Sequence, residues 1–207
     1  MPGIMIPQGR TGTEVEMWRE RVLDVAEEHF RRIGYQKTSV ADIASCLGMS
    51  SANVYRFFPS RAAINECICD RFVEQTIHLA AAVARQDAPA HDRLRRLFNL
   101  LYEERRRKLI QDKHVHDLIV AATTENWPIM SVHCSRLLTI VREIIEEGAE
   151  AGDLTVNDAV GAARSAMNAF SSFYHPVLVE ARLREPEIAR QDEVDQQINF
   201  ILSALGG

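Results

Sequence analysis

The stretch that most constrains the fold of this 207-residue chain is TSVADIASCLGMSSANVYRFFPSR, from Thr38 to Arg61. It holds two amphipathic segments, each too short to build a core alone, joined by a tight glycine-containing turn. Ser39 and Asp42 have the spacing of a capping box, which predicts where the first segment begins. Gly48 ends that segment where the backbone needs a positive φ. Val54 lies six residues further on and packs back onto the first segment, so we expect a rigid helix-turn-helix.

The rest of the chain shows helical periodicity and little strand-like alternation. Ten glycines and seven prolines leave long uninterrupted segments, and 46% hydrophobic residues suffice for a sizeable core. We therefore expect an all-α fold of nine helices, the last two covering roughly 156–182 and 186–205. The expected organisation is a loose N-terminal arm over 1–13, a helix-turn-helix domain over 14–61 and a helical body over 62–207.

Positive charge gathers around the helix-turn-helix, although the whole chain carries a net charge of −5. Residues 31–61 contain five basic residues against a single acid, Asp42. The outward side of the second short helix has short or polar groups, which suit the major groove of DNA. These groups are Ser50, Ser51, Ala52, Asn53 and Arg56. The alternative is a small three-helix subdomain without a DNA partner.

Residues 19–67 resemble the DNA-binding region of TetR-family transcriptional regulators, whose typical run is close to TT-x-x-x-IA-x-x-x-G-V-S-x-G-x-x-Y-x-Y-F-x-S-K. The resemblance implies that Tyr55 contacts a phosphate and that Arg61 replaces the usual lysine at the start of the fourth helix. It also implies that Thr38 lies near the DNA backbone. Base or phosphate contacts usually come from the positions of Ser51, Ala52 and Asn53.

This sequence departs from the family pattern at three positions. Ala52 stands in place of the usual glycine, Phe57 in place of the second tyrosine, and Ser51 in place of a frequent lysine. The last change removes one positive charge from the expected interface, which bears on the strength of non-specific binding.

The same resemblance implies a function. It predicts a regulator, most simply a repressor, that a small organic ligand releases from a double-stranded, palindromic DNA operator. The helical body would bind the ligand and form a homodimer, and the protein would be cytoplasmic, with no cofactor and no membrane association. No apolar stretch of the sequence approaches the length of a membrane span.

Two features at the C-terminus favour dimerisation independently of the resemblance. One is an apolar stripe in the last helix, and the other is a row of small residues in the helix before it, which permits close helix approach. The alternative is that both face the core of their own chain. The expected interface residues are Ala162, Ala166, Ala169, Phe173, Val194, Ile198, Ile201 and Leu202.

Apolar and aromatic residues with a few polar neighbours recur through the middle of the chain, as in a small-molecule pocket. Such residues at helical spacing also make an ordinary core. The expected lining residues are Phe98, Tyr102, His116, Ile119, Trp127, Met130, His133, Cys134, Phe170, Phe173 and Tyr174. The charged run 103–108, EERRRK, is expected to be a solvated face with internal ion pairs.

Two other function classes remain open from the residues. A helical enzyme could be built around Cys134 and nearby histidines, and a helical adaptor could dimerise and bind proteins. His114 and His116 are two residues apart on a predicted helix and therefore diverge, which disfavours a metal site. Cys134 and His133 are sequence neighbours that do not share a helix face, and no orienting acid is evident, so we expect no enzyme. Four cysteines without a CxxC spacing are typical of a reduced protein.

Overall fold

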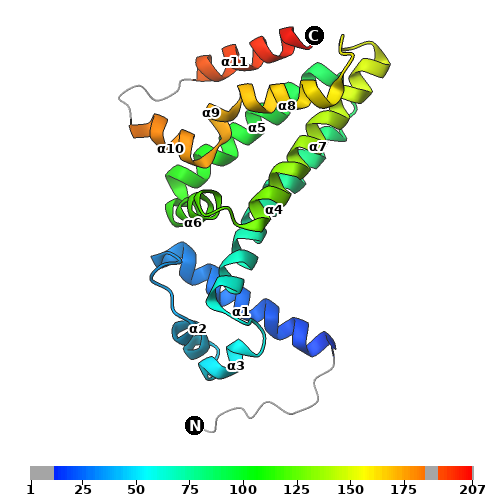
Figure 1. Ribbon diagram of the computed structural model, residues 1–207. Coiled ribbons are helices and arrows are strands. Elements are labelled where there is room, and N and C mark those ends of the chain that lie inside the picture. Colours follow the sequence, from blue (N-terminus) through cyan, green and yellow to red (C-terminus); the bar gives the residue numbers. More distant parts are fainter. Residues whose placement is uncertain (1–11, 185–190, 207) are drawn as a thin grey trace. The chain divides into compact units, whose positions relative to one another are not determined.

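The computed structural model describes residues 12–184 and 191–206, and within them it contains eleven α-helices and no β-strand (Figure 1). The helices are α1 (Gly12–Ile33), α2 (Val40–Cys46), α3 (Ser51–Tyr55), α4 (Arg61–Ala84), α5 (Ala90–Gln111), α6 (Lys113–Thr124), α7 (Pro128–Ala151), α8 (Ala159–Ala169), α9 (Ser171–Tyr174), α10 (Pro176–Arg184) and α11 (Gln191–Ala204). None of the helices in this described part is long and apolar enough to cross a membrane.

The all-α prediction is confirmed, but the expected count of nine helices is wrong for the described residues. The single helix expected over about 156–182 is divided into α8, α9 and α10. His175 has extended backbone (φ −66°, ψ 126°) because a residue before proline is disfavoured in the helical region, and Pro176 then opens α10. The expected arm over 1–13 and the expected start of the last helix fall mostly outside the described residues.

Contacts divide the described residues into two units. The first takes the residues up to Phe72 together with Asp112–Glu125, and the second takes Val73–Gln111 and the residues from Asn126 onward. Helix α4 therefore contributes to both units as one continuous helix, and α6 belongs by its contacts to the first. The functional boundary expected at residue 61 stays a prediction.

In the first unit, α1 packs against α2 and α6, and α2 packs against α3. Its core buries Phe30, Ile43, Val54 and Phe58. Arg71, in the first half of α4, ties this helix to α1. Its guanidinium forms ion pairs with three acids of α1, Glu20, Asp24 (2.9 Å) and Glu27 (3.4 Å). The short helices are thus held on a longer helical frame.

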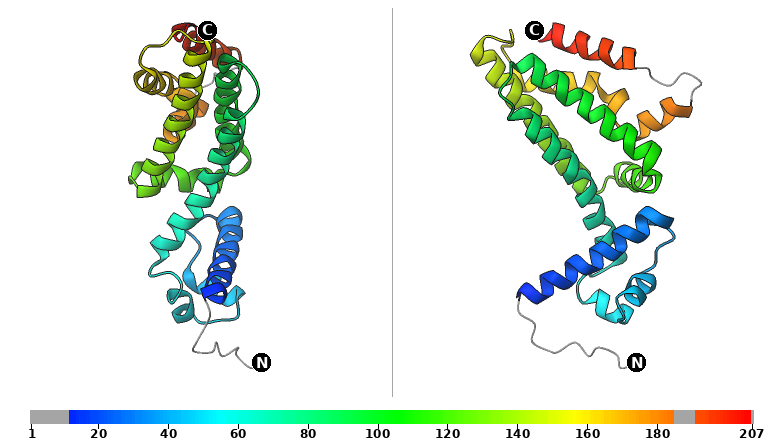
Figure 2. Two further views of the ribbon diagram at one scale, coloured as in Figure 1. Left: turned by 90° about the vertical axis from the view of Figure 1, so that its right-hand side faces the viewer. Right: turned by 180° about the vertical axis from the view of Figure 1, so that it is seen from behind.

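In the second unit, α5 is the central helix and contacts α7, α9, α10 and α11, while α8 packs on α7. Helix α11 lies along α5 and α8, as the two views of Figure 2 show. The core includes Phe98, Leu101, Val141, Phe170 and Ile198, all of which are fully buried. Gly152, with φ 79°, ends α7 as the sequence predicts.

Candidate nucleic-acid interface and helical body

Helix α2 begins with the predicted capping box. The Ser39 hydroxyl accepts a hydrogen bond from the Asp42 amide at 3.2 Å, and the Asp42 carboxylate accepts one from the Ser39 amide at 2.8 Å. Hydrogen bonds from the Ser39 side chain and then its backbone lower the pKa of Asp42. The carboxylate therefore stays ionised at the positive end of the helix dipole, which fixes where α2 starts.

The turn after α2 confirms the role predicted for Gly48. Its φ is 64°, and no atom lies within 4 Å of the place where a Cβ would be built. The glycine is therefore required by backbone conformation and not by lack of space. The amide of Met49 donates to the carbonyl of Ala44 at 3.0 Å, which closes the turn.

Helix α3 presents a short outward face. Ser50 caps it by accepting a hydrogen bond from the Asn53 amide at 3.4 Å, and Val54 is completely buried beneath it. Tyr55 leaves 48% of its surface exposed. The expected contact residues on this face are exposed (Ser50, Ala52, Tyr55, Arg56) or half-buried (Ser51, Asn53).

Two arginines hold the segments around α3 in place. Arg19 of α1 stacks its guanidinium 4.4 Å from the Phe58 ring centroid and also donates to the Phe57 carbonyl. Arg61 donates to the Gln36 carbonyl at 3.0 Å and to the Tyr35 carbonyl, so it ties the start of α4 to the loop before α2. Both arginines bond neutral carbonyl groups here, and Arg61 is exposed at the surface. Sequence reading missed the role of Arg19, since its partners lie 38 residues or more away.

Thr38, which the resemblance places near the DNA backbone, has a buried side chain, and its contact with DNA stays a prediction. It is 1% exposed, and its hydroxyl donates to the Gly34 carbonyl at 3.0 Å. Gly34 has φ 88° and ends α1. The Thr38 side chain is therefore an internal anchor of the α1–α2 loop, and the exposed cation beside it is Lys37.

Four of the expected pocket residues form one aromatic cluster in the second unit. The ring centroids of Phe98 and Phe170 lie 4.8 Å apart, those of Phe170 and Phe173 lie 5.5 Å apart, and those of Tyr102 and Phe173 lie 6.3 Å apart. All four residues are buried within the chain. The cluster joins α5 to the α8–α9 turn.

The other expected pocket residues are not all brought together. His116 and Ile119 lie on α6, which belongs to the first unit, and both are completely buried there. In the second unit Met130 is buried, Trp127 is half-buried at the start of α7, and Cys134 is exposed. Whether these residues line a ligand pocket stays a prediction.

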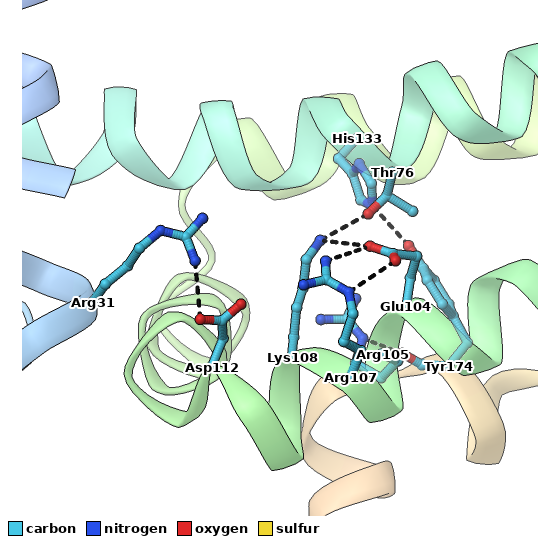
Figure 3. Close-up of polar contacts among 9 residues, drawn as sticks. All are labelled: Arg31, Thr76, Glu104, Arg105, Arg107, Lys108, Asp112, His133 and Tyr174. Carbon is cyan, nitrogen blue, oxygen red and sulfur yellow. Dashed lines mark hydrogen bonds and ion pairs between the residues drawn. The ribbon is translucent and has the colours of Figure 1, made fainter. Parts of the chain in front are cut away.

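Tyr174 connects the remaining pocket residue, His133, to Arg105 (Figure 3). The Tyr174 hydroxyl is 2.7 Å from His133 Nε2, and the Tyr174 carbonyl accepts a hydrogen bond from Arg105 Nε at 2.9 Å. The Arg105 guanidinium also lies 5.1 Å from the centroid of the Tyr174 ring. The expectation of a solvated face over 103–108 is therefore wrong for Arg105 and Lys108, which are 5% and 3% exposed.

Burial lowers the pKa of His133 from its ordinary 6.5 to about 3, and the cations Arg105, Lys108 and Arg136 add to this, against a smaller opposing effect of Glu74. At a pH between about 3 and 6.5, the His133 side chain is protonated in the unfolded chain but neutral in the folded chain. Stability is therefore expected to fall as the pH drops below 6.5, by roughly 2–3 kcal/mol at pH 4.5. Urea unfolding midpoints measured across this range should show the loss.

His133→Gln keeps a polar group beside Tyr174 but cannot titrate, so its stability should change less with pH than that of the wild type. His78→Gln is the matched control, because the His78 side chain is 76% exposed. An identical pH dependence in all three proteins would contradict the assignment.

The expected dimer residues are mostly buried within the single chain. Val194, Ile198, Ile201, Leu202, Ala166 and Phe173 are all at most 6% exposed. Their burial supports the intramolecular alternative for these side chains. A surface hollow of about 440 Å³ lies between α8 and α11 and is lined by the less buried Ala162 and Ala169, by parts of Ala166 and Ile201, and by Phe200, whose exposure is 66%.

The described residues hold no group of three His, Cys, Asp or Glu side chains placed to bind a metal ion. All four cysteines are free. Although Cys134 is exposed as a whole residue, protein atoms around it desolvate the thiol and raise its pKa, and Arg105 opposes this only in part. The thiol is therefore kept in its less nucleophilic, protonated form.

A short capped helix held outward on a helix-turn-helix, joined to a larger helical unit, defines the class of DNA-binding regulators with a helical effector body. Two family models match the chain, one for the bacterial regulatory proteins of the tetR family over residues 22–66 and one for the tetracyclin repressor-like C-terminal domain over residues 90–194. The chain belongs to the tetR family of bacterial regulatory proteins.

Among curated proteins, the chain is 31% identical over 78 residues to the HTH-type transcriptional regulator TtgR of Pseudomonas putida. That match spans 38% of this chain and 37% of TtgR. Among solved structures, a regulator from Saccharomonospora viridis in complex with choline has a TM-score of 0.67 and 23% identity, over 91% of this chain and 96% of the other. FadR of Bacillus subtilis, in complex with stearoyl-CoA, has a TM-score of 0.62 and 16% identity, over 89% and 97%.

Proposed function

We propose that this protein is a ligand-responsive transcriptional regulator that binds DNA through α3 as a homodimer and acts as a repressor. The observation that carries the proposal is the outward face of α3. It is short, capped and held on a buried Val54, and the same unit exposes the cations Lys37, Arg56 and Arg61. A rigid helix end with local positive charge is what entry into a major groove requires.

On DNA, the residues of this face divide into two roles. Asn53 and Arg56 have side chains that can hydrogen-bond to base edges. Tyr55, exposed beside them, and Arg61, at the N-terminus of α4, suit contacts to phosphates. Arg61 already bonds two loop carbonyls, which orient its guanidinium without neutralising its charge.

The second unit would receive the ligand. Its aromatic cluster and the buried polar groups around Tyr174 supply apolar walls with a few polar groups. Helix α4 has residues in both units, so it is the segment through which we propose that ligand binding reaches the DNA-binding unit. The ligand shifts operator affinity only to the extent that it binds the two arrangements differently.

Dimerisation would set the distance between the two α3 helices, which must be about 34–36 Å or a multiple to enter successive major grooves on one face. The hollow between α8 and α11, with exposed Phe200 and the alanines beside it, is the surface we propose for the contact. Of the alternatives, a cysteine enzyme is disfavoured by the raised pKa of the Cys134 thiol.

Arg61→Ala is expected to weaken binding to specific and random DNA similarly, and to lower the salt slope of log affinity by about one unit. Asn53→Ala is expected to cost about 1–3 kcal/mol on the operator and much less on random DNA. The measurement is a salt titration of each variant on DNA that flanks the protein's own coding region and on random DNA.

Arg106→Ala is the matched control for loss of one positive charge, because Arg106 is exposed in the second unit and pairs with Glu103. It should leave the salt slope unchanged. If Arg61→Ala changed base preference but not the slope, the two roles would be reversed. If neither Arg61 nor Asn53 affected DNA binding, the proposed function would fail.

A further inference from the structure

The second unit buries three cationic side chains, and they differ in how their charge is compensated. Arg93 donates to the Glu147 carboxylate at 2.6 Å. Lys108 donates to the Thr76 hydroxyl at 2.9 Å and lies 3.9 Å from the Glu104 carboxylate. Arg105 donates to the Tyr174 carbonyl and stacks on the Tyr174 ring, and no carboxylate of the described residues forms an ion pair with it.

Arg105 also has an unused donor. Its Nη1 is buried and has no hydrogen-bond partner among the residues that the structure describes. A buried charge without a counter-charge costs several kcal/mol unless something else compensates it. A guanidinium with a free donor and no ion-pair partner is suited to binding an anion.

The acids near Arg105 are already engaged by other cations. Glu104, on the same helix, accepts hydrogen bonds from Arg107 at 3.0 and 2.9 Å. Glu74 of α4 accepts a bidentate pair from Arg136 of α7. Cations therefore outnumber carboxylates here, because Glu104 is shared by Arg107 and Lys108, Glu74 pairs with Arg136, and Arg105 forms no ion pair with the described residues. Such a surplus of positive charge favours an anionic guest.

A second donor faces the same tyrosine from α7. His133 is 2% exposed, and its lowered pKa keeps it neutral at physiological pH. Burial also raises the pKa of Tyr174, so its hydroxyl keeps its proton 2.7 Å from His133 Nε2. In the tautomer that accepts from this hydroxyl, His133 carries its proton on Nδ1, which is buried and has no partner among the described residues. Figure 3 shows His133 and Arg105 reaching Tyr174 from different helices.

The apolar neighbour of this polar site is the aromatic cluster. Phe98, Tyr102 and Arg105 are four and three residues apart on α5, so they share one face of the helix. Phe170 and Phe173 cover that face from the α8–α9 turn, with ring centroids 4.8 Å from Phe98 and 6.3 Å from Tyr102. A charged end and an apolar surface therefore lie next to each other along one helix.

We propose that Arg105 binds the carboxylate of an apolar monocarboxylic acid, with His133 as a second donor and the aromatic cluster against the apolar part of the ligand. The planar guanidinium of Arg105, with one free donor, matches the geometry of a carboxylate. The proposal deepens the proposed function, on which it rests for the idea that this acid is the signal that changes DNA binding.

The test compares acids with uncharged partners of the same skeleton. Octanoate, 4-phenylbutyrate and benzoate are measured against octanol, 4-phenylbutanol and benzyl alcohol by equilibrium dialysis with the full-length protein. At least one acid is expected to bind the wild type about tenfold or more tighter than its alcohol. Arg105→Gln should abolish this preference and leave the affinity for the alcohol unchanged. Arg106→Gln, the neighbouring exposed arginine, should behave as the wild type.

Three results would overturn the proposal: equal binding of acids and alcohols by the wild type, a preference that survives in Arg105→Gln, or no binding of any acid at millimolar concentration. If Arg105→Gln does not fold, Arg105→Lys is the second variant. It keeps the positive charge but lacks the paired N–H groups of the guanidinium, so it should bind the acid several-fold more weakly than the wild type. If Arg105→Lys bound the acids as tightly as the wild type, and the wild type did not prefer acids to alcohols, the proposal would be wrong.

DNA binding separates this proposal from the proposed function. If alcohols but not acids bound the second unit and released operator DNA, the proposed carboxylate site would be wrong, but the proposed function as a ligand-responsive regulator would be supported. If acids bound through Arg105 while the protein bound no flanking DNA at all, the proposed function would be wrong, but the carboxylate site at Arg105 would be supported.

Discussion

Phe200→Glu is expected to convert the dimer into folded monomers and to reduce operator affinity by roughly 100-fold or more. Phe200 is the most exposed large hydrophobic residue of the described chain, at 66%, and it borders the hollow lined by Ala162 and Ala169. A charge placed there would be desolvated on dimerisation without a partner. A monomer presents a single α3, so it loses the gain from holding two half-sites at once.

Sedimentation velocity and a gel shift on the flanking DNA measure the two effects. Val132→Glu is the matched control, because Val132 is also an exposed apolar residue, at 52%, but lies on α7 away from this hollow. It should remain dimeric. A dimeric Phe200→Glu protein with normal operator affinity would place the interface elsewhere.

Ile198→Glu, two residues earlier on the same helix, is expected to unfold the second unit and not to produce folded monomers. Ile198 is completely buried in a core shared by α5, α7, α8 and α11. The change removes an apolar side chain and buries an unpaired carboxylate in its place. We expect a loss of stability of about 4 kcal/mol or more.

Urea unfolding followed by circular dichroism tests this expectation, with Phe200→Glu as the comparison on the same helix. The Ile198 variant should lose most of its stability while the Phe200 variant keeps its own. If Ile198→Glu gave stable, folded monomers, the stripe on α11 would be an interface after all, and the burial of Ile198 within one chain would be wrong.

The contrast between these two variants shows what periodicity in a sequence can decide. The spacing of Val194, Ile198, Ile201 and Leu202 correctly places them on one face of one helix. Spacing cannot say whether that face is covered by the same chain or by a second copy, because both bury apolar area equally well. Only the tertiary structure shows α5 and α8 covering it, which leaves Phe200 outside.

The charged run 103–108 illustrates a related limit. Its internal ion pairs were predictable, since Arg106–Glu103 and Arg107–Glu104 are three residues apart on a helix. Arg105 stands three residues after Tyr102 and seven after Phe98, so its place on the buried face could have been read from the spacing. Its partner Tyr174, 69 residues away, could not.

The sequence by itself determined the helix-turn-helix, because the signals that build it are local. The capping box of Ser39 and Asp42, the positive φ of Gly48 and the burial of Val54 each depend on residues within one or two turns of helix. The break of the expected eighth helix at Pro176 was also a local signal, and its effect on His175 follows from proline sterics alone.

Only the tertiary structure decided which groups distant in the sequence contact one another and which charged groups lack an ion-pair partner among the described residues. Arg19 reaches Phe57 and Phe58, Arg61 reaches the loop before α2, and Tyr174 receives both His133 and Arg105. These contacts join residues between 25 and 69 positions apart. Local helix propensities cannot predict such long-range contacts, because these contacts form only after packing of the apolar helix faces has brought the helices together.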